Sequence, residues 1–78
     1  MGTFYIQRVR HDENDVILAV RTMKNTFETK EVVKMINSGD TFFVLNENGP
    51  RVGVYAEKFI RSYKDGKWTN NLDELPEF

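Results

Sequence analysis

The fold of this chain depends most on residues 59–78, FIRSYKDGKWTNNLDELPEF. The alternation of apolar and polar residues predicts a strand from Phe59 to Tyr63, a turn at Lys64–Lys67 and a short returning strand at Trp68–Thr69. The stretch also contains the only tryptophan of the chain. Because a small domain rarely leaves its largest apolar side chain in solvent, we expect Trp68 to be a core or lid residue rather than a ligand platform.

The end of this stretch predicts a short helical turn. Either residue of the pair Asn70-Asn71 can cap that turn by accepting a hydrogen bond from a free backbone N–H. Leu72 and Leu75 lie three residues apart and therefore share one face of it, and Pro76 discourages further helix. We interpret residues 59–78 first as a structural clasp that completes a small core.

The N-terminal third predicts two strands, Thr3–Val9 and Val16–Thr22, which are rich in β-branched and aromatic residues. The polar connection His11–Asp15 is short enough for an antiparallel hairpin. We expect alternate residues of the second strand to face the core. A loop at Met23–Glu28 follows, in which Phe27 is expected to tuck under the domain.

One helix is predicted from Thr29 to Ser38. The Thr29 hydroxyl is expected to be the N-cap, and Gly39 suits the left-handed position after the last turn. Val32, Val33 and Ile36 form an apolar stripe at helical spacing. A helix of this length is marginal alone, so it must pack on a sheet.

The most apolar run, Thr41–Leu45, predicts a central strand. In the turn that follows, Asn48-Gly49 is expected to supply positive φ values, and strand pairing should resume at Arg51 because Pro50 lacks an N–H. The sequence therefore predicts a single α+β domain over residues 1–78. Its mostly antiparallel sheet has about five strands in ββαβββ order, with one packed helix and a C-terminal helical turn.

Composition limits the classes of function. The 78 residues carry 11 Lys and Arg against 12 Asp and Glu, which argues against a domain whose main task is to coat nucleic-acid phosphates, although a local basic face is compatible with this balance. There is no cysteine, so no disulfide or thiolate chemistry is available. No apolar segment is long enough to span a bilayer, and we expect a cytoplasmic protein.

No catalytic or metal-binding constellation emerges. His11, the only histidine, is followed by Asp12 and Glu13, but consecutive residues in a loop point in divergent directions and no second histidine completes a ligand set. A solvated turn is the favoured interpretation. Asp12-x-Asn14-Asp15 lacks the glycine and late glutamate of a calcium loop. We expect no enzymatic activity and no cofactor.

A set of basic and aromatic residues is the candidate binding surface. It converges on one side if the N-terminal hairpin and the Phe59 strand are neighbours, and stacking on its rings would suit single-stranded nucleic acid or nucleotides. The members of the set are Arg8, Arg10, Arg21, Arg61, Tyr63, Lys64, Lys67, Trp68 and Asn70. The favoured alternative is that these cations pair with the equally numerous acids.

The chain resembles the domain of unknown function 3892 family, a group of short bacterial and phage proteins. The resemblance rests on Lys30-Glu31-x-Val33 through Ile36 and Gly39, Phe43-x-Leu45, Phe59-Ile60-Arg61, Asp65-Gly66 and Asn70-Asn71-Leu72-x-x-Leu75-Pro76-Glu77. Asp73 stands where the family pattern has a second leucine. The resemblance implies a compact strand-rich fold with one helix, a phage or mobile-element origin, and no particular activity.

The function predicted from sequence is a non-enzymatic binding or protein-interaction module, acting as a monomer or a homodimer. We expect the C-terminal segment to close the sheet face that the single helix leaves open, with a second copy of the chain as the alternative. The alternative is a nucleic-acid or nucleotide binder that uses the basic and aromatic set.

Overall fold

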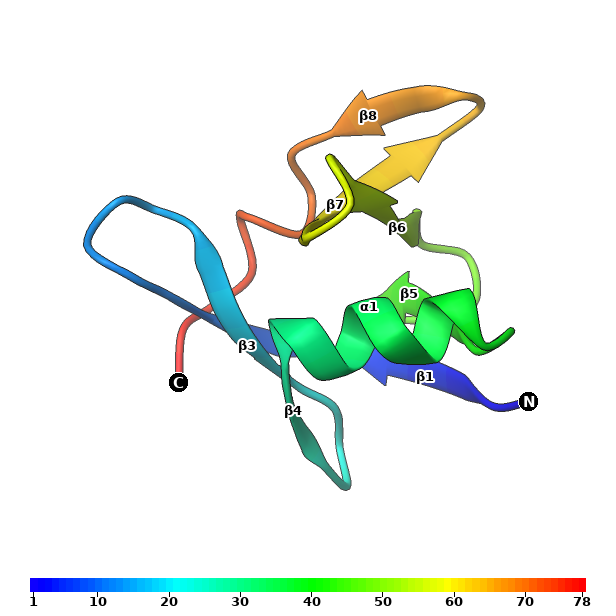
Figure 1. Cartoon of the computed structure of the whole chain (residues 1–78), viewed down its shortest axis with the longest axis horizontal. Coiled ribbons are helices and arrows are strands. Elements are labelled where there is room, and N and C mark those ends of the chain that lie inside the picture. Colours follow the sequence, from blue (N-terminus) through cyan, green and yellow to red (C-terminus); the bar gives the residue numbers. More distant parts are fainter.

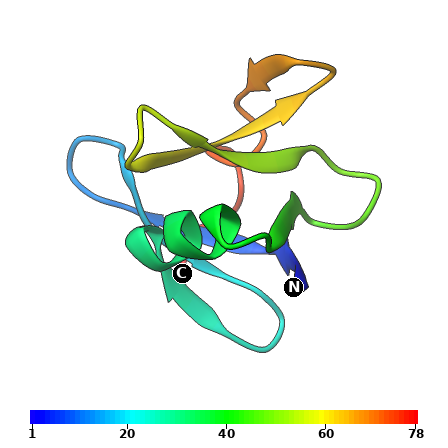
Figure 2. The same ribbon diagram turned by 45° about the vertical axis from the view of Figure 1, so that its right-hand side comes forward.

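The computed structural model describes all 78 residues and folds them into two sheets and one helix (Figures 1 and 2). The elements in chain order are β1 (Thr3–Ile6), β2 (Arg8–His11), β3 (Ile17–Arg21), β4 (Thr26–Glu28), α1 (Thr29–Asn37), β5 (Thr41–Val44), β6 (Arg51–Tyr55), β7 (Phe59–Lys64) and β8 (Lys67–Thr69). No helix in this set is long and apolar enough to cross a membrane.

The larger sheet has the strand order β1-β5-β6-β7-β8, and the smaller has the order β2-β3-β4. Only β1 and β5 pair in parallel, and every other strand pair is antiparallel. The predicted α+β class and mostly antiparallel pairing are confirmed. The prediction of a single sheet of about five strands was wrong, because the chain forms eight strands in two sheets.

The first of the extra strands comes from a break at Gln7. Ile6 and Val9 are both fully buried, and an odd spacing of three cannot place two residues on one face of a continuous strand. The chain turns between them, and the Gln7 N–H donates to the Arg21 carbonyl at 2.8 Å. The predicted strand Thr3–Val9 is therefore two strands that enter different sheets.

The small sheet shows the same departure from simple alternation. The hairpin of β2 and β3 is antiparallel as predicted, but Ile17 and Val20 are the buried residues of β3, and the pairing is irregular between Arg10 and His11. A bulge of this kind changes which side chains face the core. The expected loop at Met23–Glu28 was also wrong in part, since Thr26–Glu28 forms β4 and pairs with β3. Phe27 packs against the core as expected.

The helix α1 begins at Thr29 as predicted, but its N-cap is the preceding residue. Glu28 is the N-cap, with φ −74° and ψ 154°, and its N–H donates to the Glu31 carboxylate at 3.0 Å. The Thr29 hydroxyl is not the cap: it donates to the Ile17 carbonyl at 2.6 Å and ties the buried first turn to β3. The predicted end is confirmed, with Ser38 as the C-cap and Gly39 at φ 103°.

The helix fills the space between the two sheets. It lies between the β6–β8 hairpins and the β3–β4 hairpin in both views (Figures 1 and 2), and it contacts both sheets. Val32 is fully buried, and the predicted stripe continues with Val33 and Ile36 packed against the core. On the large sheet the core face is made by residues such as Phe42 and Ile60.

The turn after β5 does not use the expected conformations. The positive φ value falls on Leu45, at 68°, and not on Asn48 or Gly49. Gly49 is required for a different reason, because a Cβ atom there would lie 1.9 Å from the Val44 carbonyl oxygen. Pairing resumes at Arg51 as predicted, opposite Phe43.

Residues 70–78, which follow β8, form the C-terminal segment and close the core, and we call this segment the clasp. Leu72 and Leu75 are buried as predicted. The free backbone N–H of Leu72 at the start of the turn donates to the Ser62 hydroxyl at 3.1 Å, and not to an asparagine side chain as expected. The segment then runs along β2 as an additional parallel bridge between Val9 and Glu77. It thereby connects the large sheet to the edge of the small one.

Candidate functional site

The candidate site is the face of the large sheet that points away from α1. Residues directly opposite one another in neighbouring strands share a face, and the register places one set of aromatic and arginine side chains on this side. We call it the aromatic face: Tyr5, Phe43, Arg51, Gly53, Tyr55, Arg61, Tyr63 and Trp68. All three tyrosines and the only tryptophan of the chain belong to it.

The two faces of the large sheet differ sharply in burial. On the inner face, Phe42, Val52 and Ser62 are all buried, whereas no residue of the aromatic face is. Tyr55 is 39% exposed and Trp68 is 43% exposed. The expectation that Trp68 belongs to the core was therefore wrong, because its strand places it on the open side of the sheet.

The arginines of the aromatic face lie over its rings. The guanidinium carbon of Arg61 is 5.0 Å from the centre of the Tyr55 ring and 5.9 Å from that of Trp68. The guanidinium carbon of Arg51 is 5.9 Å from the Phe43 ring centre. These contacts hold each cation by attraction to the ring quadrupole and leave its N–H groups available to a ligand.

The rings also pack against one another. Trp68 makes edge-on contacts with Tyr55 at 5.2 Å and with Tyr63 at 5.6 Å between ring centres. Gly53 makes room for this arrangement, because a Cβ atom on it would lie 2.8 Å from a ring carbon of Tyr63. The glycine of β6 is thus a packing requirement of the aromatic face.

The aromatic face is locally basic and free of acids. The strands of the large sheet contain Arg51, Arg61, Lys64 and Lys67 but no Asp or Glu. The ion pairs of the molecule join His11 to Asp73 and Glu77, and Lys30 to Glu28, so no arginine has a carboxylate within 4.0 Å. The favoured interpretation that these cations pair with acids was therefore wrong for the arginines.

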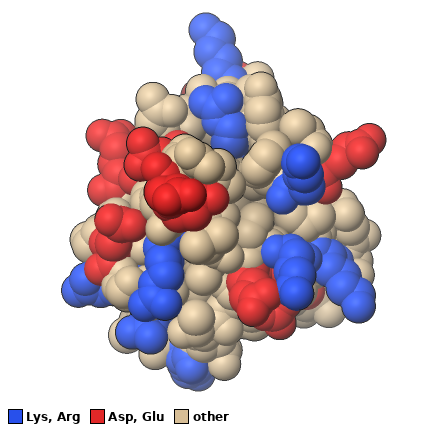
Figure 3. Space-filling model, turned by 60° about the vertical axis from the view of Figure 1, so that its left-hand side comes forward, with Lys and Arg blue, Asp and Glu red and all other residues tan.

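Elsewhere the two signs of charge are mixed. Figure 3 shows the side of the molecule that lies to the left in Figure 1, and there the Lys and Arg groups alternate with Asp and Glu groups around an uncharged centre. The whole chain thus has a net charge of −1, whereas the strands of the large sheet carry only positive charges. The charge that matters for binding is local.

The structure brings together only part of the predicted binding set. Arg61, Tyr63 and Trp68 meet on the aromatic face, and Lys64 and Lys67 face each other at the end of the same hairpin. Asn70 lies beyond β8, where its carbonyl accepts the Glu74 N–H of the C-terminal turn.

Arg8, Arg10 and Arg21 belong to the small sheet instead. The guanidinium carbons of Arg10 and Arg21 lie 4.6 and 4.5 Å from the centre of the Phe78 ring, and Arg10 Nε donates to the Phe78 carbonyl at 2.9 Å. Arg8 and Arg21 are paired across the strands. These arginines hold the C-terminal segment and are not part of the aromatic face.

His11 lies in a strand rather than in a solvated turn. It ends β2, its side chain is only 14% exposed, and its ring nitrogens lie 3.2 Å from Glu77 and 3.5 Å from Asp73. The His11 backbone N–H also donates to the Glu77 carboxylate at 3.0 Å. This hydrogen bond, followed by the one to the imidazole, lowers the pKa of Glu77 below its usual 4.5.

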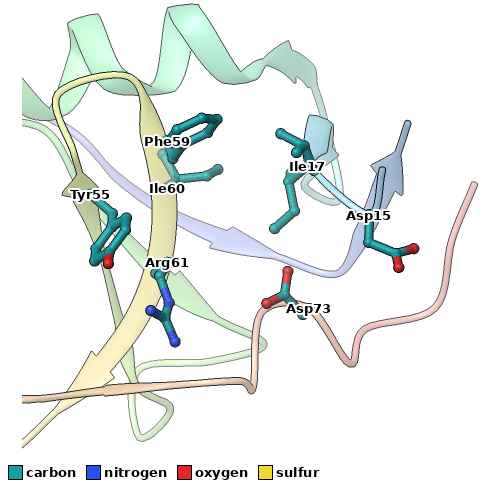
Figure 4. Close-up of a pocket in the computed structure, with 8 residues that line it drawn as sticks. Asp15, Ile17, Tyr55, Phe59, Ile60, Arg61 and Asp73 are labelled. Carbon is teal, nitrogen blue, oxygen red and sulfur yellow. The ribbon is translucent and has the colours of Figure 1, made fainter. Parts of the chain in front are cut away.

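A cleft of about 240 Å³ opens beside the aromatic face, between the start of β3 and β7 (Figure 4). Ile17, Phe59 and Ile60 form apolar walls, while Tyr55 and Arg61 are shared with the aromatic face. Val16, Asp15 and Asp73 complete the lining. In Figure 4 the Asp73 carboxylate points into the cleft and the Asp15 carboxylate points away from it.

Sequence reasoning missed Tyr5, Phe43, Arg51 and Tyr55 as members of the face. A signal was present in the two-residue spacing of Arg51-x-Gly53-x-Tyr55 and Arg61-x-Tyr63. Folding these two segments against each other across their turn puts Arg51 opposite Tyr63 and Gly53 opposite Arg61. The contribution of β1 and β5 depends on a parallel pairing that local sequence does not indicate.

Comparison with known proteins yields one match. The family model described as "Protein of unknown function (DUF3892)" matches residues 5–76, nearly the whole chain. No curated protein and no solved structure matches. The matched region includes every residue of the aromatic face, from Tyr5 to Trp68.

Proposed function

The chain belongs to the DUF3892 family of proteins of unknown function, and we propose that it is a non-enzymatic module that binds single-stranded nucleic acid on its aromatic face. The observation that carries this proposal is the set of exposed rings interleaved with arginines on an acid-free sheet. Every nucleobase has a π face, so such a surface stacks unpaired bases while its cations neutralise phosphates.

A single strand suits this surface better than a duplex does. Readout of a duplex needs a helix or a two-stranded ribbon that enters a groove, whereas the only helix here packs between the two sheets and the exposed rings lie on the face of a sheet. An open sheet face instead accepts splayed, unstacked bases. We propose that this function is exercised in the cytoplasm, where single-stranded nucleic acid is accessible. A domain without cysteine needs no disulfide and is therefore compatible with a reducing compartment.

The test is a titration of the protein with a thymidine oligonucleotide of about ten nucleotides, within the range that small single-strand-binding domains cover. Trp68 is the only tryptophan and is exposed on the face, so stacking should change its emission directly. Neutralising about four phosphates predicts that log affinity falls with log salt with a slope of roughly −3. No change in emission at low salt would contradict the proposal.

A matched pair of variants separates the face from general surface effects. Trp68→Ala should weaken binding of a labelled oligonucleotide about 5- to 100-fold, the usual cost of losing one stacked base. Met23→Ala removes another highly exposed apolar side chain, in the β3–β4 connection, and should leave binding unchanged. Both variants should melt near the wild-type midpoint, and equal losses of affinity would refute the proposed surface.

A protein partner is the second candidate, and one observation favours it. Trp68, Tyr55 and Arg61 are the residue types that dominate the binding energy of protein interfaces, and here they form one cluster. A second copy docked face to face would bring like charges together, so we expect a monomer in sedimentation experiments. A dimer that Trp68→Ala dissociates would favour self-association and overturn the nucleic-acid proposal.

A further inference from the structure

The cleft beside the aromatic face has the properties of a small recognition pocket. Its volume of about 240 Å³ is below the roughly 300–1,000 Å³ that drug-sized ligands occupy, so it suits one planar group. Its walls are apolar, from Ile17, Phe59 and Ile60. A flat ring system that enters it would be buried against these side chains.

The cleft is continuous with the aromatic face. Tyr55 and Arg61 belong to both, and Arg61 lies over the Tyr55 ring at 5.0 Å. A strand that crosses the aromatic face would therefore pass the mouth of the cleft. One base of such a strand would then lie within reach of the cleft.

The polar groups of the cleft specify a hydrogen-bonding pattern. The Asp73 carboxylate points inward and can only accept, because an ionised carboxylate has no proton to donate. The position of this carboxylate is stabilised by His11, whose Nε2 atom lies 3.5 Å from Asp73 Oδ1. Arg61 lines the cleft from β7, and its guanidinium, which carries only donors, lies over the Tyr55 ring at the edge of the cleft.

From this arrangement we propose that the cleft is a nucleobase pocket selective for guanine. The inference rests on the proposed binding of single-stranded nucleic acid. Guanine presents two neighbouring N–H donors, which suit Asp73, and the O6 and N7 acceptors, which suit an arginine such as Arg61. Thymine presents two carbonyl acceptors on either side of one N–H, and these repel a carboxylate.

The test compares two labelled oligonucleotides of about ten nucleotides each, one of thymidines only and one with a single central guanosine. The wild-type protein should bind the guanosine-containing strand about 5- to 100-fold more tightly, the usual discrimination of a bidentate base contact. Asp73→Asn should remove this preference. Asp73 is 45% exposed, so the substitution leaves the core intact, and the melting midpoint checks this.

Asp15→Asn is the matched control. It removes the same charge from the lining of the same cleft, but the Asp15 carboxylate points away from the interior. This variant should keep the guanine preference, and both variants should bind the thymidine strand alike. Equal binding of the two strands by the wild type, or loss of the preference in both variants, would overturn the guanine pocket while the proposed function stands. Failure of both strands to bind would refute the proposed function itself.

Discussion

The molecule carries two clusters in which arginines lie over aromatic rings, one on each sheet, and they serve different purposes. On the small sheet, the guanidinium groups of Arg10 and Arg21 lie over the ring of Phe78, and Arg10 Nε donates to the main-chain oxygen of Phe78. On the large sheet, Arg61 lies over Tyr55 and Trp68, whose rings are exposed. We call the small-sheet cluster the closed cluster, because the C-terminal segment of the chain occupies its arginines. We call the large-sheet cluster the open cluster, because its rings are exposed to solvent.

The difference shows that arginine–aromatic contact alone does not indicate a binding site. What separates the clusters is whether the chain itself uses the donors and covers the ring. Phe78 arrives with the C-terminal segment and brings a main-chain acceptor, so the small-sheet cluster is already occupied. On the aromatic face, Tyr55 and Trp68 remain exposed, and no carboxylate lies within 4.0 Å of Arg51 or Arg61.

The largest effect should come from loosening the segment that closes the first cluster. Leu72 is buried, and its replacement by Ala should lower the free energy of unfolding by about 2–5 kcal/mol, because it leaves a cavity in the core. For a domain of this size that is a large share of the total stability. Urea unfolding followed by circular dichroism measures it.

The same variant also distinguishes the two clusters. Under conditions where Leu72→Ala remains folded, its affinity for the thymidine oligonucleotide should match that of the wild type, since the Leu72 side chain is buried in the core and is not part of the aromatic face. A loss of affinity without unfolding would show that the clasp and the open face are one functional unit. That result would contradict the distinction between a structural cluster on the small sheet and a binding cluster on the large sheet.

The second prediction concerns the open cluster. Gly53→Ala places a Cβ atom 2.8 Å from a Tyr63 ring carbon, so the Tyr63 ring, which packs against Trp68, must shift. Overpacking of this kind costs about 1–3 kcal/mol, and the disturbed ring arrangement should bind the oligonucleotide more weakly. Gly66→Ala is the control for stability alone, because its added Cβ meets no atom although its φ of 80° is strained. An unchanged affinity in Gly53→Ala would mean that the ring arrangement is not needed for binding.

The third prediction exchanges one arginine in each cluster. Arg10→Gln should reduce stability by about 1–2 kcal/mol through loss of a charged hydrogen bond and a cation–π contact, with no change in oligonucleotide affinity. Arg61→Gln should cost less than about 1 kcal/mol in stability but weaken oligonucleotide binding about 5- to 10-fold at low salt. Matching profiles for the two variants would contradict the division into a closed and an open cluster.

Much of the large sheet could be predicted from sequence because its signals are local. The β7–β8 hairpin with its Asp65-Gly66 turn, the central strand β5 and the end of α1 at Ser38 all follow from short-range periodicity and turn chemistry. The buried leucines of the C-terminal segment follow in the same way.

The remaining features depend on partners far along the chain. The break at Gln7 arises because Ile6 and Val9 face the same core from two sheets, and Thr29 gives up its cap role because the Ile17 carbonyl is within reach. Trp68 appeared as a core candidate because composition alone does not reveal which face of a strand is covered. The basic set appeared as one surface because nothing local separates Arg10 from Arg61.

The smallest effect concerns the pH dependence of the closed cluster. Hydrogen bonds from the His11 backbone and ring depress the pKa of Glu77 below 4.5, so the folded state binds this proton less readily than the unfolded state does. The resulting stabilisation is complete above about pH 4.5 and is lost as the pH falls through the lower, folded-state pKa.

Glu77→Gln should therefore lose stability less steeply than the wild type in thermal melts between about pH 5 and pH 3. Glu47 lies in an exposed turn without an ion pair, so the control variant Glu47→Gln should follow the wild type. Binding of the thymidine oligonucleotide at neutral pH should be the same for all three proteins, because Glu77 pairs with His11 on the small sheet; weaker binding by Glu77→Gln alone would extend the functional surface along the C-terminal segment beyond Asp73.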